Sequence, residues 1–297
     1  MWFDEDVTHD QYPALEKVPS DVDVCVVGAG IAGLSVAYNC TSVNDGDFFF
    51  TGTKKKKKTH SGAGAHHGLR VLVVDKGEIG SGETSRTTAH CFSWLDDWYT
   101  RIEHIHGVKG ASLAAESHQE AIDFIERVCK YEDIECDMHR LDGWLLQKVD
   151  AMPQFCHDST SRGKGAAAMI QEFGAAQRAG CHDVELLHLA PIPGVDTGDT
   201  VRFPMQAAFH PVKYINGLAR AATSRGAQIY TNTRVVDFDH IDNNRAVIKT
   251  ANGLTIYARH LVFLFFIFYC FFYSYFFFLK KRCLQPTRPS TTSSLCT

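Results

Sequence analysis

The apolar positions near the N-terminus outline a strand, a glycine-rich turn, a helix and a second strand. Residues 23–27 form a compact apolar run that ends at a glycine, which is typical of a strand buried on both faces. Residues 31–39 have helical spacing, and residues 69–75 form a second apolar run that ends in an acidic residue. This order predicts a βαβ unit.

From there to residue 262 the pattern alternates between helical and strand-like stretches. It predicts helices at about 96–106, 109–131, 164–179 and, opened by Pro211, 212–224. It also predicts a hairpin over 136–147 that turns at 141–143. Further strands are expected at 203–209, 227–231, 233–238, 245–250 and 254–262. We therefore expect the α/β class, α+β overall, with a second sheet interleaved into a doubly wound cofactor domain.

Two segments break these patterns. Residues 41–68 contain F-F-F and K-K-K-K-K and show no periodicity, so they read as an insertion. Residues 261–279 are uncharged and rich in Phe and Tyr, and K-K-R and a Ser/Thr/Pro tail follow. By length this run predicts a membrane span with a basic anchor. Natural spans favour Leu, Ile and Val, however. Our main hypothesis is therefore that 45–66 and 263–297 are translated non-coding sequence from retained introns or a faulty gene model.

Composition narrows the function classes. The chain has 297 residues, 45% of them hydrophobic, and a net charge of −4, which suits a globular protein and argues against a nucleic-acid partner. The acidic N-terminus does not resemble a signal peptide, so we expect a cytoplasmic or organellar protein, or a membrane protein if 261–279 is a genuine span. The ten cysteines have no metal-ligand spacing, which predicts reduced thiols and no metal site.

The glycine-rich turn reads G-A-G-I-A-G and lies between the first strand and the first helix. The first glycine permits a tight turn, the second lets the backbone approach a pyrophosphate, and the third lets helix and strand pack closely. The helix N-terminus also offers N–H groups and partial positive charge to phosphates. The predicted dinucleotide-binding residues here are Gly28, Gly30, Ile31, Ala32 and Gly33.

Asp75 ends the second strand, and we expect it to accept hydrogen bonds from an adenosine ribose. It follows the turn at more than the usual spacing of about 20 residues, and removing residues 45–66 would restore that spacing. A nicotinamide domain normally continues into a crossover helix. Here residues 76–90 instead form a loop rich in glycine and hydroxyl groups. Such a loop can hydrogen-bond a pyrophosphate and a ribityl chain, which favours FAD over NAD.

The G-A-G-I-A-G turn, the V-V-D-K-G strand end and the G-S-G-E-T-S-R-T-T-A-H loop together resemble the FAD-dependent oxidoreductases of the D-amino-acid oxidase type. This group includes enzymes that oxidise sarcosine, glycine and dimethylglycine. The S-G-E-T-S-R-T-T-A-H version is most similar to members that often carry a C-terminal Rieske domain. The stretches A-A-E-S-H, R-F-P-M-Q-A-A-F-H-P-V-K-Y-I-N-G-L-A-R and T-R-V-V-D also match that subgroup. The resemblance covers about 1–40 and 69–262.

The resemblance implies a Rossmann-like FAD-binding domain, 1–262, with an interleaved antiparallel-sheet substrate domain. It places Asp75 and Lys76 at the adenosine and the backbone of Val235 at the adenine. It places four loop residues beside the ribityl chain and flavin, namely Ser85, Arg86, Thr87 and Thr88. Family members usually continue well beyond the returning strand that begins at Arg259. By resemblance, the chain is therefore C-terminally truncated, its cofactor site is incomplete and its activity is impaired.

Five side chains are candidates for catalysis or substrate binding, and the sequence leaves their roles open. His90 ends the hydroxyl-rich loop and either polarises the flavin, attaches it covalently, or serves as a structural histidine. His210 opens a helix from which Lys213 or Tyr214 could bind a substrate carboxylate. Arg202 is a further candidate for binding this carboxylate. The alternative is that the helix residues provide only capping and a solvated lysine.

The implied reaction is hydride transfer to flavin N5 from the C–H bond beside an amine nitrogen, in a small-molecule amine or amino acid. The absence of a G-x-S-x-G or Cys/His constellation agrees with a reaction that needs no protein nucleophile. The electron acceptor, oxygen or an iron–sulfur partner, stays open. The alternatives are a membrane-anchored flavoprotein and a non-catalytic FAD-binding fragment.

Overall fold

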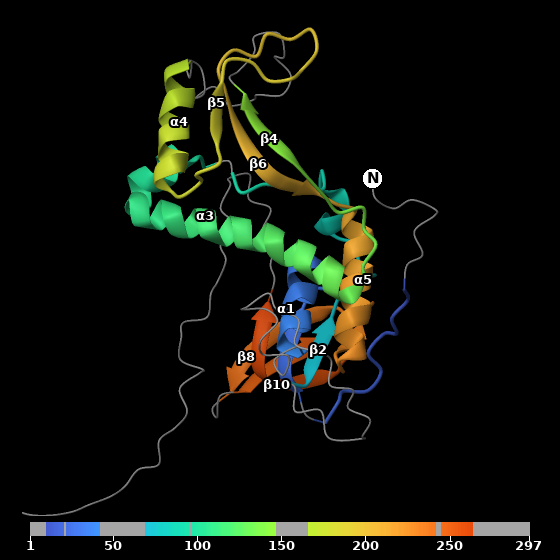
Figure 1. Cartoon of the computed structure of the whole chain (residues 1–297). Coiled ribbons are helices and arrows are strands. Elements are labelled where there is room, and N and C mark those ends of the chain that lie inside the picture. The colour runs from blue at the N-terminus through green and yellow to red at the C-terminus, as the bar shows by residue number, and fades with distance from the viewer. Residues whose placement is uncertain are drawn as a thin grey trace, which may run out of the picture. The chain divides into compact units, whose positions relative to one another are not determined.

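The computed structural model describes residues 10–20, 22–41, 69–94, 97–146, 166–241 and 245–263 (Figure 1). All of them belong to a first compact unit, Met1–Leu264, and a second unit comprises Phe265–Thr297. The unusual stretches 42–68 and 264–297 lie outside the described residues, as do the predictions made for them.

A six-stranded sheet with the strand order β7-β2-β1-β10-β9-β8 forms the centre of this unit. Its first four strands are parallel: β7 (Gln228–Tyr230), β2 (Val71–Val74), β1 (Val22–Val27) and β10 (Thr255–Phe263). In chain order these strands are arranged 3-2-1-4, so the direction of the connections changes between β1 and β10. Open α/β sheets bind ligands outside the carboxyl ends of their strands at such a switch.

The other two strands of the sheet form an antiparallel meander with β10. They are β8 (Val235–Ile241) and β9 (Arg245–Thr250). Residues 255–258 of β10 pair with β9, whereas residues 258–263 pair with β1. This long strand therefore belongs both to the meander and to the parallel sheet.

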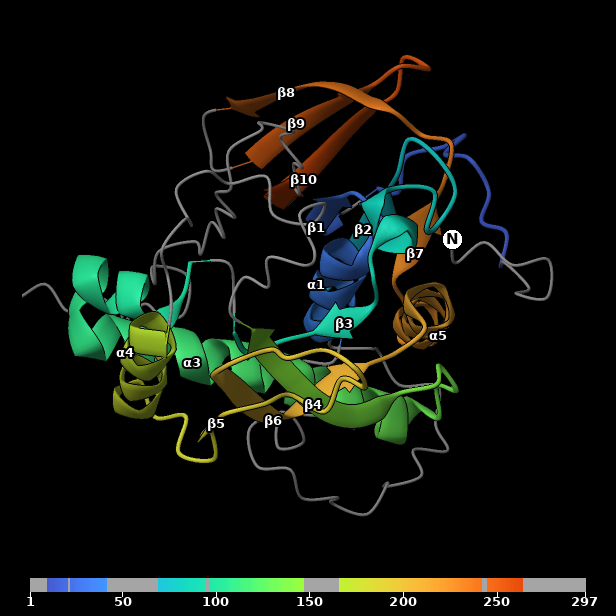
Figure 2. The same ribbon diagram turned by 90° about the horizontal axis from the view of Figure 1, so that it is seen from above.

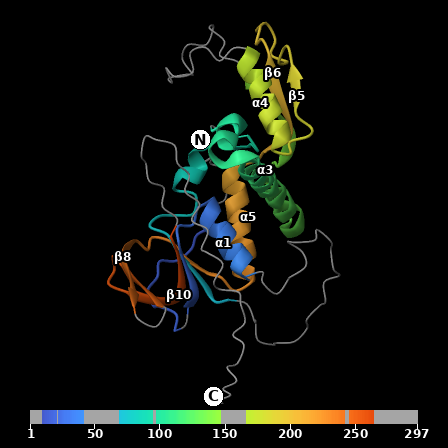
Figure 3. The ribbon, with the colours of Figure 1, turned by 90° about the vertical axis from the view of Figure 1, so that its left-hand side faces the viewer.

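Two helices cover one face of the parallel strands and the meander covers the other (Figure 2). The helices are α1 (Ile31–Thr41) and α5 (Pro211–Ser224), which lie side by side and bury Leu34 and Leu218 against β1 and β2 (Figure 3). Alternate residues of the strands point to the opposite face, where the meander buries Ile248. The strands are apolar on both faces because both faces are covered.

A second sheet is built around β6 (Thr200–Ala208). β4 (His139–Leu146) runs antiparallel along its length. Two short strands pair with opposite ends of β6, β3 (His90–Cys91) at Ala207 and Ala208 and β5 (Glu185–Leu187) at residues 200–202. Because β3 follows directly from the loop after β2, the two sheets are joined at the hydroxyl-rich segment.

Two further helices, α3 (Tyr99–Glu132) and α4 (Ala166–Arg178), cover one face of the second sheet. Met169 of α4 and Phe203 of β6 are buried there in one cluster. α3 contains a non-helical residue at Gly107, with φ +71°, where the sequence predicts the boundary between two helices. α3 contacts both α4 and α5.

The N-terminus of α3 is capped from α4. The Glu172 carboxylate, which is fully buried, accepts hydrogen bonds from the backbone N–H groups of Tyr99 (2.6 Å) and Thr100 (3.0 Å) and from the Trp94 indole (3.3 Å). The residue before the helix, Trp98, makes no side-chain cap of its own. A buried carboxylate is favourable at this position because the first N–H groups of a helix lack intrahelical partners and carry partial positive charge.

The predicted α/β fold with an interleaved antiparallel sheet is confirmed, and one predicted element is wrong. The hairpin expected over 136–147 is the single strand β4, and its register against β6 shifts between Leu141 and Gly143. The Asp-Gly pair that signals a turn in the sequence is a strand irregularity here. Gly143 fits tightly, because an added Cβ would lie 3.0 Å from the Gln206 side chain and 3.2 Å from Phe92.

Across the described ranges, no helix combines the length and apolar character that crossing a bilayer requires. The first three residues of the predicted span, Leu261 to Phe263, belong to β10 and pair in register with residues 25–27 of β1. The prediction that a span begins at 261 is therefore wrong. Residues 264–279 lie outside the described residues.

Candidate functional site

The glycine-rich turn connects the end of β1 to the start of α1, at the carboxyl edge of the parallel sheet. Gly28 has φ +111°, a conformation that side chains disfavour, and its N–H donates to the Val74 carbonyl of β2 (2.9 Å). The first helical bond runs from the Leu34 N–H to the Gly30 carbonyl (3.0 Å). The N–H groups of the first turn of α1 therefore face the edge where the strand order switches.

Asp75 joins this turn to the end of β2. Its carboxylate accepts the Ala29 N–H at 2.6 Å through Oδ2 and the Gly77 N–H at 2.9 Å through Oδ1. The Asp75 N–H donates to the carbonyl of Tyr230 at the end of β7 (3.0 Å), and the Asp75 carbonyl accepts the N–H of Thr233 just after β7 (2.7 Å). The acid therefore lies beside the glycine-rich turn although residues 42–68 separate the two along the chain.

Thr84 is a residue of this site that the sequence reasoning missed. It lies in a short 3₁₀ helix, η1 (Glu83–Arg86), and its Oγ1 accepts the Ile31 N–H at 3.2 Å. A Cβ placed on Gly30 would lie 3.2 Å from the same oxygen. The threonine therefore fixes the distance between the hydroxyl-rich loop and the glycine-rich turn. The cluster of hydroxyl residues was the available signal, but it does not distinguish Thr84 from its neighbours.

These residues fit the pyrophosphate and ribose of a dinucleotide. Asp75 holds the Ala29 N–H just before α1, and Thr84 holds the Ile31 N–H at its start. The other N–H groups of the first turn of α1 suit an anion. The glycine at position 30 leaves the space in which a phosphate approaches the backbone. Asp75 supplies an acceptor at the edge where a ribose hydroxyl would lie.

The other loop residues predicted at the cofactor are arranged around η1. Ser85 is fully buried and its hydroxyl donates to the Gly82 carbonyl (3.1 Å). Arg86 is exposed and donates to the carbonyls of Ser81 (3.0 Å) and Gly82 (2.8 Å). Thr87 and Thr88 are exposed, and the Thr87 hydroxyl accepts the Ala89 N–H (3.2 Å).

The two remaining predicted cofactor residues lie near Asp75. Lys76 follows it directly and is exposed. Val235 begins β8, two residues after Thr233, whose N–H donates to the Asp75 carbonyl. The connection between β7 and β8 therefore reaches the same edge of the sheet as the glycine-rich turn.

His90 and His210 lie where the two sheets are joined. His90 opens β3, is exposed, and stacks on Phe92 with ring centroids 5.7 Å apart. His210 is the N-cap of α5, and its Nδ1 accepts the Lys213 N–H at 3.2 Å. His210 therefore caps α5, which is one of the roles that the sequence leaves open for this helix start.

The other three candidates make internal contacts. Arg202 forms ion pairs with Asp142 (2.9 Å) and Glu185 (2.9 Å), and the hydrogen bond to Asp142 contributes most to raising the pKa of the guanidinium. The Lys213 ammonium pairs with Asp137 at 2.8 Å. Tyr214 is fully buried, packs edge-on against Phe209, and burial raises the pKa of its hydroxyl.

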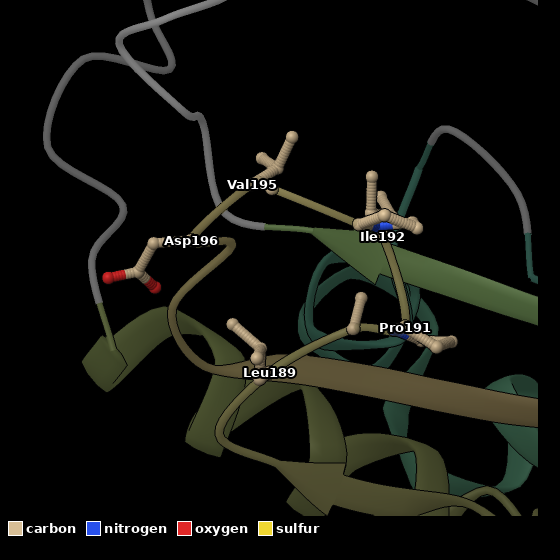
Figure 4. Close-up of a pocket in the computed structure, with 8 residues that line it drawn as sticks. Leu189, Pro191, Ile192, Val195 and Asp196 are labelled. Atoms are coloured by element: carbon tan, nitrogen blue, oxygen red, sulfur yellow. The ribbon is translucent and has the colours of Figure 1, made fainter.

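The surface hollow and the possible metal sites add no catalytic group. The loop 189–196 borders an open hollow that is lined by its own residues, including Leu189, Ile192 and Val195 (Figure 4). Asp196 is its single ionisable residue, and it points away from the apolar lining. Within the part of the chain that the structure describes, no cluster of three or more His, Cys, Asp or Glu residues is placed to bind a metal ion.

Comparison with known sequences identifies the family. The pattern described as FAD dependent oxidoreductase (DAO) matches residues 23–264. The chain belongs to this family. FAD is therefore the cofactor to which the dinucleotide geometry of the glycine-rich turn corresponds, and the predicted resemblance is confirmed.

Individual relatives agree with this assignment. The putative Rieske 2Fe-2S iron-sulfur protein YhfW of Bacillus subtilis is 24% identical over 245 residues, which is 82% of this chain and 40% of YhfW. Among solved structures, L-proline dehydrogenase from P. horikoshii is 16% identical with a TM-score of 0.55, and the match covers 83% of this chain and 53% of the dehydrogenase. Glycine oxidase from Geobacillus kaustophilus is 18% identical with a TM-score of 0.55, and the match covers 81% of this chain and 54% of the oxidase. The chain thus spans about half the length of the proteins it matches.

Proposed function

We propose that this FAD-dependent oxidoreductase oxidises a small amine or amino acid, with its FAD anchored at the glycine-rich turn. The observation that carries the proposal is the convergence of Asp75 and Thr84 on the glycine-rich turn and the start of α1, at the switch in strand order. These contacts preorganise the backbone N–H groups that would meet the pyrophosphate.

The remaining cofactor contacts follow from the same edge. Asp75 would accept hydrogen bonds from the ribose hydroxyls, and the backbone of Val235 would border the adenine. The segment from Ser85 to Thr88 would follow the ribityl chain, because it runs from η1 toward β3. When bound, FAD supplies hydride acceptance at the flavin from a C–H bond beside an amine nitrogen.

The chain's own contribution to the reaction is binding, orientation and exclusion of water. His90 follows the FAD-contacting loop and begins the second sheet, so it is our first candidate to contact the flavin ring. Its neighbour Phe92 would supply an apolar wall beside it. Arg202 and Lys213 are secondary candidates for a substrate carboxylate, because binding there would have to displace carboxylates of the chain.

The substrate class rests on the named relatives. Proteins of similar fold carry the names L-proline dehydrogenase, glycine oxidase and L-amino acid deaminase. Each name refers to an amino acid as the molecule acted on. The proposal extends that class to this chain, and the electron acceptor stays open between oxygen and an iron–sulfur partner.

The visible absorption spectrum of the purified chain, followed by anaerobic addition of amino acids and secondary amines, tests the proposal. We expect the bands of bound oxidised flavin and their bleaching by at least one compound. Bound flavin that no amine bleaches would support FAD binding without amine oxidation. Absence of flavin after reconstitution would contradict the proposed cofactor site.

A pair of glycine variants localises the cofactor. In Gly30→Val the added carbons would occupy the phosphate approach beside Thr84, so we expect loss of bound flavin. Gly82→Ala is the matched control from the same loop, since its Cβ would meet no atom within 4 Å and its φ is −91°. Equal flavin content in both variants would place the cofactor elsewhere.

A further inference from the structure

Two cysteines that the cofactor site does not use lie in contact in the core. The Sγ atoms of Cys129 and Cys136 are 3.3 Å apart. Both thiols are free and buried, with 7% and 1% of their surfaces exposed. The sequence, which has no C-x-x-C pair, predicts only scattered reduced thiols, so this contact is decided by the fold.

The backbone holds the two sulfurs together. α3 ends at Glu132, and its C-cap Asp133 reverses the chain through a left-handed conformation (φ +56°). The N–H groups of Asp133 and Ile134 both donate to the Cys129 carbonyl. The Cys136 carbonyl accepts the His210 N–H at 2.6 Å. Main-chain bonds on both sides of the pair therefore limit how far the cysteines can separate.

The same turn contacts α5. The Ile134 side chain packs against Gly217, where an added Cβ would lie only 2.5 Å away. Through His210 and Gly217 the turn supports the first half of α5, and α5 in turn contacts η1 beside the glycine-rich turn. A covalent link between residues 129 and 136 would consequently fasten the end of α3 to the segment that supports the FAD side of the molecule.

We propose that Cys129 and Cys136 form a reversible intramolecular disulfide when the protein meets hydrogen peroxide. The Cys136 thiolate attacks the peroxide oxygen, which gives a sulfenic acid and releases water after protonation. The Cys129 sulfur then displaces the hydroxyl group as a second water and loses its proton. Two thiols and one hydrogen peroxide thus give one disulfide and two waters.

The surroundings of Cys136 set the order of attack. Either thiol can donate in the contact between the sulfurs. With Cys129 as the donor, the bond lowers the pKa of Cys136 and raises that of Cys129, and a backbone hydrogen bond from Met138 and the charge of Lys213 also favour a thiolate at Cys136. The thiolate is the nucleophile in thiol oxidation. Cys136 is therefore assigned the attacking role and Cys129 the resolving role. This inference does not depend on the identity of the oxidised substrate.

Peptide mapping of the full chain tests the proposal without any substitution. The reduced protein is treated with hydrogen peroxide, alkylated in denaturant, and digested with trypsin without reductant. Cleavage after Arg127, Lys130 and Arg140 separates the two cysteines into peptides 128–130 and 131–140. We expect these peptides to appear joined and lighter by two hydrogen atoms, and dithiothreitol to release them.

Cys25 provides a control that is matched for burial. It is fully buried in β1, and burial alone raises the pKa of its thiol to about 12. We expect the Cys25 thiol to stay reduced under the conditions that join the two peptides, and therefore to be found alkylated. Separate, fully alkylated peptides 128–130 and 131–140 would overturn the proposal. A link from 131–140 to the peptide that contains Cys91 would overturn it as well.

Single substitutions then test the assigned roles. In Cys129→Ser the resolving thiol is missing, so dimedone should trap a sulfenic acid at Cys136 in peptide 131–140. In Cys136→Ser we expect several-fold less trapping at Cys129. Equal trapping at the two positions would contradict the order of attack, and the mapping of the unmodified chain still decides the disulfide if either variant fails to fold.

Discussion

The parallel-sheet side and the second sheet use their polar side chains differently. On the parallel-sheet side, Asp75 and Thr84 bind backbone N–H groups of the glycine-rich turn and so prepare it for a ligand. In the second sheet, Arg202 pairs with carboxylates of its own strands. Arg140 likewise pairs with Asp123 (2.6 Å) and Glu126 of α3.

This difference separates cofactor binding from internal stabilisation. A side chain that orders backbone donors at a helix start increases what the site can offer to an anion. A side chain that already satisfies its charge within the fold must lose those contacts before it binds a substrate. The contacts of the proposed cofactor residues therefore suit a ligand site, whereas those of Arg202 in the second sheet suit internal stabilisation.

The largest expected effect belongs to the second-sheet side. Glu172→Ala removes the buried acceptor of three donors, so we expect the free energy of unfolding to fall by about 3 kcal/mol in urea denaturation. FAD affinity in the folded variant should change little. The exposed Glu120→Ala is the control and should stay within about 0.5 kcal/mol. A comparable loss in the control would break the comparison.

The next effect concerns the acid at the cofactor edge. Asp75→Ala removes the acceptor of the Ala29 and Gly77 N–H groups together with the proposed ribose contact, so the Kd for FAD should rise about 10- to 100-fold in a fluorescence titration. Asp196→Ala, in the loop 189–196 between β5 and β6, should leave the Kd for FAD unchanged. An Asp75 variant that binds FAD normally would refute the assignment of this edge.

A smaller effect is expected at the threonine that the sequence did not single out. Thr84→Val keeps the shape but removes the oxygen that holds the Ile31 N–H, so FAD affinity should fall roughly fivefold. Thr84→Ser retains the hydroxyl and should stay within about twofold. Equal affinities of the Val and Ser variants for FAD would show that the contact does not position the turn.

The smallest effect is expected at Arg202, the charged candidate of the second sheet. Arg202→Ala should lower the free energy of unfolding only slightly, because its ion pairs are partly exposed. If it serves only these pairs, KM for an oxidised substrate should match that of the unsubstituted protein. A KM at least about tenfold higher for Arg202→Ala alone would show that it binds the substrate carboxylate.

The sequence predicted most of the fold because its patterns are local. Apolar runs buried on both faces marked β1 and β2, and helical periodicity marked α1, α4 and α5. The elements it missed, β3, β5 and η1, span only two to four residues. Segments this short contain no full hydrophobic period, and tertiary pairing with β6 and α5 decides their conformation.

By itself the sequence determined the glycine-rich turn, its strand and helix, the acidic residue Asp75 at the end of the second strand, and the FAD family, because these depend on backbone conformation encoded over a few neighbouring residues. Only the tertiary structure decided which hydroxyl meets the turn, that Glu172 caps α3, and that two cysteines lie in contact. Each of these contacts joins different elements or depends on how a helix ends, and no local pattern specifies which side chains the packing of sheets and helices brings together.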